Sequence, residues 1–165
     1  KFEKEGTYKE TFTDINGDES EIDFMHQCET NNDYDNDRYQ ADVQILNINF
    51  VDRKQPSKLY HLHDLGGTAV YNVFQGDNEF VITGKLKDWH FRDQLKNIKV
   101  PTLLTFGENE TMPLDTAKIM QKEIPNSRLV TTPNGGHHHM VDNPDVYYKH
   151  LADFIREVES GEFNK

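Results

Sequence analysis

Residues 100–107 form a short apolar run closed by a glycine, Val100-Pro101-Thr102-Leu103-Leu104-Thr105-Phe106-Gly107. Its length and composition predict a buried strand of a parallel sheet. A second run of this kind is Arg128-Leu129-Val130-Thr131-Thr132. Between the two runs, apolar residues recur at helical spacing and a proline follows them: Leu114, Ala117, Met120, Ile124 and Pro125. We therefore expect a strand, a helix and a second, parallel strand.

Polar loops follow both predicted strands, Gly107-Glu108-Asn109-Glu110 after the first and residues 133–139, which contain His137, after the second. Because the carboxyl ends of parallel strands share one rim of a sheet, we expect Glu110 and His137 to be neighbours. A carboxylate beside an imidazole fixes its tautomer and stabilises its protonated form, as in a hydrolase triad. An acid followed by a histidine near the chain's end is the order of α/β-hydrolases, whose serine comes earlier. A generic α/β unit with polar loops is the alternative.

The last segment of the chain predicts an amphipathic helix. Asn143-Pro144 has the pattern of a capping residue followed by proline at the first helical position. Tyr147, Leu151, Phe154 and Val158 then place apolar side chains on one face.

The totals exclude several classes of protein. The 165 residues carry a formal net charge of −11, and residues 1–42 alone hold 13 acids against 4 bases. Such a chain is not expected to bind nucleic acid or an anionic membrane. One cysteine, Cys28, cannot form an internal disulfide and fits a reducing compartment. No apolar run approaches membrane length, and the first residues have no signal-peptide pattern, so we expect a cytoplasmic protein.

The first half of the chain is predicted to be mostly helical. Residues 1–20 are polar, and the weak alternation of Thr7 to Phe12 predicts an edge strand. Tyr39, Val43, Leu46 and Phe50 lie on one face of a predicted helix, and Thr68 to Phe74 predicts another. His61 and His63 lie two residues apart on a polar segment; a metal pair is one interpretation, and two surface histidines are the favoured one.

Two acidic turns raise the question of calcium. Asp14, Asn16 and Asp18 match the first ligand positions of an EF-hand loop, and the same spacing recurs in Asp33, Asp35 and Asp37. Both loops lack the glycine at the sixth position and the glutamate at the twelfth. We therefore expect solvated acidic turns, no metal site and no cofactor, with a small calcium-binding protein as the alternative.

Three further segments make the sequence recognisable as a whole. They are Gly76-Asp77-Asn78-Glu79-Phe80, then Thr83-Gly84-Lys85-Leu86-Lys87-Asp88-Trp89, then residues 92–103, which end in Ile98-Lys99-Val100-Pro101-Thr102-Leu103. In combination they resemble the proline iminopeptidase family of α/β-hydrolase serine peptidases. The resemblance covers about residues 22–159 and implies a partial α/β-hydrolase fold with a helical cap.

The resemblance also implies an activity and a site. Members of that family release an N-terminal residue, usually proline, from peptides, with serine as nucleophile, histidine as base and an acid that orients the histidine. His137 matches the catalytic histidine and Glu110 the position of the acid, while Glu79 matches the cap glutamate that binds the substrate's amine. His138 and His139 are alternatives to His137, and Glu108 and Asn109 are alternatives to Glu110. Glu79 as an ordinary surface carboxylate is the alternative to its amine-binding role.

On this interpretation the chain divides into a polar N-terminal segment (1–20), a helical cap region (21–90) and the C-terminal βαβα part of the hydrolase core (91–165). The family's oxyanion loop, His-Gly-Gly-Pro-Gly, and its nucleophile elbow, Gly-x-Ser-x-Gly-Gly, are not found. The serines are Ser20, Ser57, Ser127 and Ser160, and none lies in such a motif.

We therefore expect little or no peptidase activity from the isolated chain, because an acid and a base have nothing to activate without the nucleophile. The competing hypothesis is a catalytically inactive remnant that binds peptide N-termini or a partner chain. Two strands without neighbours also leave sheet edges exposed, which predicts self-association through those edges.

Overall fold

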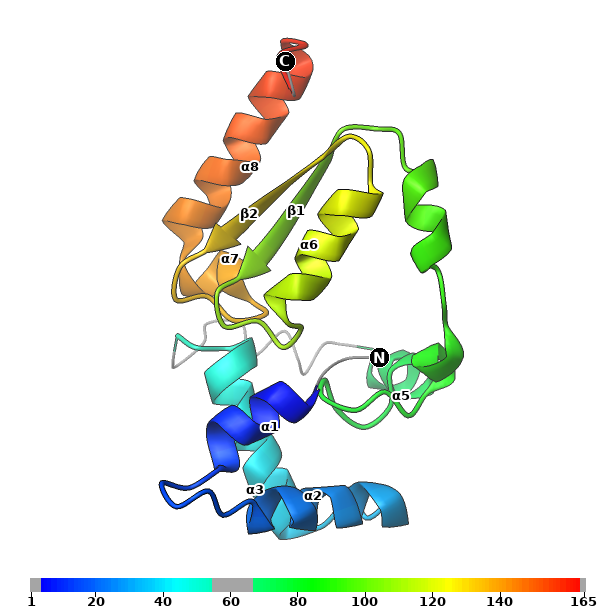
Figure 1. Ribbon diagram of the computed structural model, residues 1–165, viewed down its shortest axis with the longest axis vertical. Helices are drawn as coiled ribbons and strands as arrows, with labels where there is room; N and C mark the ends of the chain where they lie inside the picture. The colour runs from blue at the N-terminus through cyan, green and yellow to red at the C-terminus, as the bar shows by residue number, and fades with distance from the viewer. Residues whose placement is uncertain (1–3, 55–66, 164–165) are drawn as a thin grey trace.

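The computed structural model describes residues 4–54 and 67–163 (Figure 1). His61 and His63, and the part of the expected cap that surrounds them, lie outside the described residues.

The C-terminal part is a two-stranded parallel sheet between helices. β1 (Thr102–Gly107) pairs with β2 (Ser127–Thr132), and the register runs from Thr102 opposite Ser127 to Gly107 opposite Thr132. The connection is α6 (Leu114–Glu123), and α8 (Pro144–Glu159) follows the short α7 (His139–Asp142). In Figure 1, α6 and α8 flank the sheet. The βαβα arrangement expected from residues 100–158 is confirmed.

Burial explains why these segments fold as they do. Leu104 and Phe106 of β1 are buried, and Ala117 of α6, the helix that contacts both strands, is fully buried. Pro144 stands at the first position of α8, as expected. The expected side-chain cap by Asn143 is wrong: its amide donates instead to the Pro133 carbonyl at 3.1 Å, which ties the start of α8 to the loop after β2.

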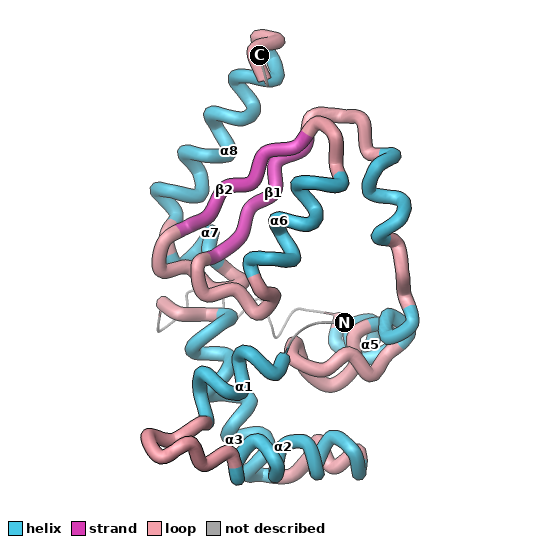
Figure 2. The backbone as a smooth tube through the Cα atoms, in the orientation of Figure 1, coloured by secondary structure: helices cyan, strands magenta, loops and turns pink. Residues whose placement is uncertain are grey.

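The N-terminal part is a cluster of helices that lies apart from the sheet in Figure 2. It contains α1 (Lys4–Phe12), α2 (Ser20–Asn31) and α3 (Asp37–Leu46), and a π-helical turn η1 (Asn47–Val51) extends α3. Their shared core is made of side chains that are all at least 95% buried: Tyr8, Ile22, Met25, Cys28, Tyr39, Val43, Leu46, Phe50, Val51 and Phe80.

The edge strand expected within residues 7–12 is wrong, because this segment belongs to α1. A weak alternation over six residues also contains a pair four apart, Tyr8 and Phe12, which both pack against the helical core. Tyr8 is fully buried and donates a 2.7 Å hydrogen bond to the Glu29 carboxylate on α2. A helix satisfies this tertiary contact together with the backbone hydrogen bonds of the segment.

Irregular chain connects the two parts. After α5 (Thr68–Phe74), the 3₁₀ turns Lys85–Asp88 and Arg92–Asn97 lead into β1. Arg92 forms a 2.9 Å ion pair with Glu123 at the end of α6. Among the helices of the described ranges, none is long and apolar enough to cross a membrane.

The acidic turns of the first half are closed by their own hydrogen bonds. The Asp14 carboxylate accepts the amide N–H groups of Asn16 and Asp18 at 2.7 and 2.8 Å. Within residues 4–54 and 67–163, no three His, Cys, Asp or Glu side chains are grouped closely enough to hold a metal ion.

The helical core yields a stability prediction from two neighbouring residues. Leu46 is fully buried, whereas the side chain of Ile45 is 44% exposed. Leu46→Ala should lower the free energy of unfolding by about 2–5 kcal/mol, because it leaves a cavity in the core. Ile45→Ala is the matched control and should change it by no more than about 1 kcal/mol. Urea denaturation measures both, and equal losses would contradict this packing.

Candidate active site

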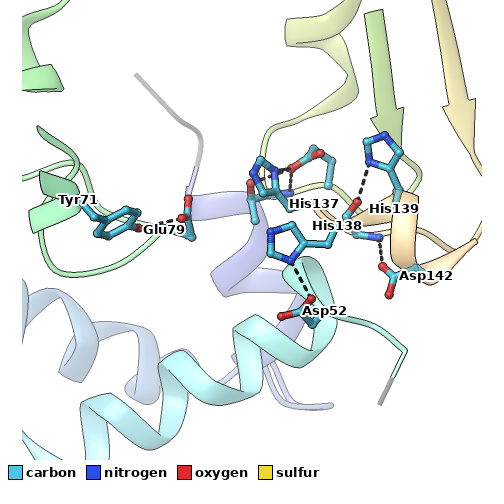
Figure 3. Close-up of polar contacts among 10 residues, drawn as sticks. Asp52, Tyr71, Glu79, His137, His138, His139 and Asp142 are labelled. Carbon is cyan, nitrogen blue, oxygen red and sulfur yellow. Dashed lines mark hydrogen bonds and ion pairs between the residues drawn. The ribbon is translucent and has the colours of Figure 1, made fainter. Parts of the chain in front are cut away.

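The loops after β1 and β2 bring an acid and an imidazole into direct contact. The Nδ1 atom of His137 lies 2.7 Å from Oε1 of Glu110, so the expected proximity of these residues is confirmed (Figure 3). The Glu110 side chain is 5% exposed and that of His137 is 38% exposed. A buried carboxylate that accepts from Nδ1 keeps the proton on that nitrogen and leaves Nε2 as the basic nitrogen.

Glu110 is held by its neighbour as well as by His137. The backbone N–H and the hydroxyl of Thr111 both donate to Glu110 Oε1 at 2.9 Å. Burial acts to raise the pKa of Glu110, but the hydrogen bonds and charge of His137 and the donors of Thr111 outweigh it and lower that pKa below its ordinary value. Glu110 therefore remains a carboxylate in a largely dry position.

The charge around His137 favours its protonated form. The hydrogen bond to Glu110 raises the pKa of His137, burial opposes it, and the charges of Glu110, Glu79 and Asp52 add to the rise. Negative charge of this kind stabilises the imidazolium that forms when a histidine accepts a proton from a nucleophile.

The other two acid candidates of the loop are engaged elsewhere. The Glu108 carboxylate accepts the Asn134 amide at 3.0 Å, and the backbone N–H of Asn109 donates to the Gly135 carbonyl at 2.8 Å. Of Glu108, Asn109 and Glu110, the structure places Glu110 against His137.

The three consecutive histidines have three different environments. His138 bonds through Nδ1 to Asp52 Oδ1 at 2.7 Å. His139 is 4% exposed, and its Nδ1 lies 3.2 Å from the Gly136 carbonyl oxygen. The ring of His139 packs edge-on against Tyr147. His137 combines a carboxylate partner from the acidic loop with an accessible ring.

Glycines let the two loops approach each other. A Cβ atom on Gly107 would lie 2.2 Å from the Gly136 carbonyl oxygen, and one on Gly136 would lie 2.6 Å from the Phe50 carbonyl oxygen. The histidine loop is thus packed by its main chain on two sides. Only residues without side chains fit at these contacts.

The end of the α3 and η1 helices forms the third wall of the site. The backbone N–H groups of His137 and His138 donate to the carbonyls of Phe50 and Val51 at 2.7 and 3.0 Å. The Asp142 carboxylate accepts the amides of Gly136 and Lys54, each at 2.8 Å. These contacts fix the histidine loop to the helical part.

Glu79 faces the same site from the irregular segment that follows α5. Its carboxylate accepts the Tyr71 hydroxyl proton at 2.8 Å, and Figure 3 places it between Tyr71 and the histidines. Next to it, buried Asn78 accepts the amides of Phe80 and Val81 and donates to the Tyr39 hydroxyl at 3.1 Å. Asn78 therefore anchors the loop that carries Glu79 to α3.

The described serines lie away from His137. Ser20 begins α2, and Ser160 follows α8. Ser127 begins β2, at the opposite end of the strand from the histidine loop, and its hydroxyl donates to the Ile124 carbonyl at 2.9 Å. Ser57 lies outside the described residues.

An open hollow of about 270 Å³ adjoins the acid side of the site. It is lined by α1 and by the loop after β1, including Gly6, Glu10, Glu110 and Thr111.

Sequence reasoning missed three residues that shape the site: Asp52, Tyr71 and Asn78. The Asp52 and Asn78 contacts join segments far apart in the chain, which no local pattern predicts. Asn78 stands beside Glu79 in a quoted motif and Tyr71 lies eight residues before Glu79, so the sequence pointed to their region but not to these contacts.

Comparison with known proteins agrees with the motifs. No family model matches the chain. The chain is 33% identical over 128 residues to a proline iminopeptidase of Thermoplasma volcanium. The aligned residues make up 76% of this chain and 43% of that protein. For a proline iminopeptidase of Saccharolobus solfataricus, identity is 38% over 96 residues, 58% of this chain and 31% of that protein. The chain thus spans less than half the length of these two relatives.

Solved structures show the same fold. The crystal structure of the proline iminopeptidase of Mycobacterium smegmatis has a TM-score of 0.76 and 20% identity, over 93% of this chain and 51% of that one. The structure of VinJ also has a TM-score of 0.76, with 22% identity over 84% of this chain and 48% of that one. The expected partial α/β-hydrolase fold and the resemblance to proline iminopeptidases are confirmed.

The Glu110 contact yields a pH prediction. The raised pKa of His137 contributes stability below its ordinary value of 6.5, and this is lost as pH rises through the folded value. The lowered pKa of Glu110 contributes stability above its ordinary value of 4.5, and this is lost as pH falls through the folded value. The loss of unfolding free energy in Glu110→Gln should therefore be largest between pH 4.5 and 6.5.

Urea denaturation across pH measures this dependence, and NMR titration of the imidazoles should show a lower pKa for His137 in Glu110→Gln. Glu108→Gln is the control from the same loop, because that carboxylate bonds Asn134. It should leave the His137 titration close to that of the unaltered chain. An unshifted His137 in Glu110→Gln would contradict the pairing.

The glycine contact yields a second prediction. Gly136→Ala should lower the free energy of unfolding by about 1–3 kcal/mol, because its Cβ would meet the backbone of Phe50 and the chain has to shift. Gly6→Ala, where nothing lies within 4 Å of the added Cβ, is the control in α1 and should be neutral or slightly stabilising. Thermal melts compare the two, and an undisturbed Gly136→Ala would argue against the close contact.

Proposed function

We propose that this chain, which resembles proline iminopeptidases over part of their length, supplies the acid, the base and the amine-binding carboxylate of a serine aminopeptidase. The substrates would be peptides with an N-terminal proline. The observation that carries the proposal is the 2.7 Å contact between the buried Glu110 carboxylate and His137 Nδ1 at the carboxyl ends of two parallel strands.

In this mechanism each residue has one role. His137 Nε2 removes the proton from a serine hydroxyl as its oxygen attacks the scissile carbonyl, and Glu110 stabilises the imidazolium that forms. The imidazolium then gives the proton to the leaving amine, and water repeats the sequence to release the acyl group. Glu79 pairs with the substrate's ammonium group, which restricts the reaction to the first residue of a peptide. No cofactor takes part in these steps.

The nucleophile is the part that these 165 residues do not supply. They contain no Gly-x-Ser-x-Gly, and the described serines lie elsewhere in the fold. In the proposal, the serine comes from polypeptide outside this sequence or from a partner chain. A cytoplasmic location and pairing through the sheet edges remain predictions.

The lack of a Gly-x-Ser-x-Gly segment in these 165 residues favours a second candidate, a non-catalytic module that binds peptide N-termini. Such a module would use Glu79 in the same way and would leave the Glu110–His137 pair without a reaction. Binding and hydrolysis therefore have to be measured separately.

Binding can be tested on the chain as it is. A dipeptide amide with a free N-terminal proline should bind roughly tenfold or more tightly than its N-acetyl form, because the ammonium forms a charge-assisted hydrogen bond with Glu79. Isothermal titration calorimetry should show that Glu79→Gln loses this preference, whereas Glu159→Gln, an exposed control, keeps it. Equal binding of the two peptides would refute the amine-binding role.

Hydrolysis needs a separate assay. The 165-residue chain should release no proline from a proline arylamide, whereas a longer protein from the source that contains this sequence should do so. In that longer protein His137→Gln should lower kcat by about 10⁴-fold or more. Amine-dependent binding with no hydrolysis in either form would select the binding module.

A further inference from the structure

We propose that His138 and Asp52 are positioning residues, which hold the His137 ring against Glu110 by pinning the histidine loop to the end of the helical part. The catalytic meaning of this inference rests on the proposed function. Its geometric content concerns only the orientation of His137 and stands separately.

The two side chains form a second imidazole–carboxylate pair beside the first. His138 Nδ1 lies 2.7 Å from Asp52 Oδ1, and the rings of His137 and His138 are 5.5 Å apart (Figure 3). The Asp52 side chain is 7% exposed and that of His138 is 26% exposed. A carboxylate so deeply buried is costly unless it is hydrogen-bonded, so this contact constrains both residues.

The His138–Asp52 pair lies directly beside His137 and can therefore set its position. His138 follows His137 directly, and both backbone N–H groups donate to the last carbonyls of the π-helical turn, Phe50 and Val51. Asp52 is the next residue after those carbonyls. Main-chain and side-chain contacts therefore join the same two segments, which are 86 residues apart between Asp52 and His138. Loss of the side-chain contact removes one of the bonds that hold these two segments together.

Asp52 also acts on His137 through its charge, and the two effects have to be separated. The acidic groups that raise the pKa of His137 are Glu110, Glu79 and Asp52, and the His138 ring lies beside it. Removal of the His138 ring leaves the Asp52 charge in place, so the field alone would keep the pKa of His137 raised. A looser contact with Glu110 would lower it. The two explanations therefore predict different results in a variant without the His138 ring: a pKa of His137 that stays raised, or one that falls.

The test compares His138→Ala with His138→Asn by NMR titration of the His137 ring nitrogens. The asparagine amide nitrogen is the same number of bonds from Cα as the imidazole Nδ1, so it can still donate to Asp52. We expect the pKa of His137 to fall toward 6.5 in His138→Ala, together with faster exchange of its Nδ1 proton, and to stay near its unaltered value in His138→Asn. Likewise, the Nδ1 proton of His137 should exchange more slowly in Asp52→Asn than in Asp52→Ala.

An unchanged or higher pKa of His137 in His138→Ala would overturn the inference and leave the pair with a purely structural role. The inference also fails if His138→Asn behaves like His138→Ala. Circular dichroism and the remaining imidazole signals show whether each variant is folded, and the asparagine variants keep the test open if the alanine variants unfold. No hydrolysis is measured, so failure of this inference and failure of the aminopeptidase proposal give different results.

Discussion

The structure depends on the hydrogen bonds that the carbonyl groups at the end of the η1 turn accept from the histidine loop. The last carbonyls of a helix have no partner within it, and here the Phe50 and Val51 carbonyls accept the amides of His137 and His138. Gly136 makes the approach possible, because a side chain at that position would collide with the Phe50 backbone. These bonds join the helical part and the sheet part at His137. The position of His137 therefore depends on both parts of the chain.

Electrostatics then decide what the site can do. The chain is acidic, and three of its carboxylates raise the pKa of His137. A base works best with a pKa near the working pH, since too high a value keeps it protonated and too low a value makes it weak. Burial of the ring opposes the carboxylates and limits the rise. The balance between Glu110, which lies in contact, and burial is therefore the quantity that sets the strength of this base.

What the sequence predicts follows from the range of each interaction. The strands, α6 and α8 come from local periodicity, and the Glu110–His137 contact follows from topology, because both loops end parallel strands. The local pattern of α1 is ambiguous, and its fully buried Tyr8 is placed by a tertiary contact with α2. The Asp52–His138 pair joins residues 86 apart with no shared motif. Asn143 has a capping sequence, yet its side chain bonds Pro133, which only the folded chain brings near.

Among the described residues, Glu110 and His137 are ordered without a serine beside them. Thr111 holds Glu110, Glu110 holds His137 Nδ1, and the backbone of His137 is bonded to Phe50. None of these contacts involves a serine. Preorganised groups need no rearrangement when the reacting partner arrives, so an added serine would find the His137 Nε2 already oriented. The same order would persist in a protein that has no serine to activate. The geometry of the pair therefore supports the proposed chemistry, while the origin of the nucleophile decides between an aminopeptidase and a binding module.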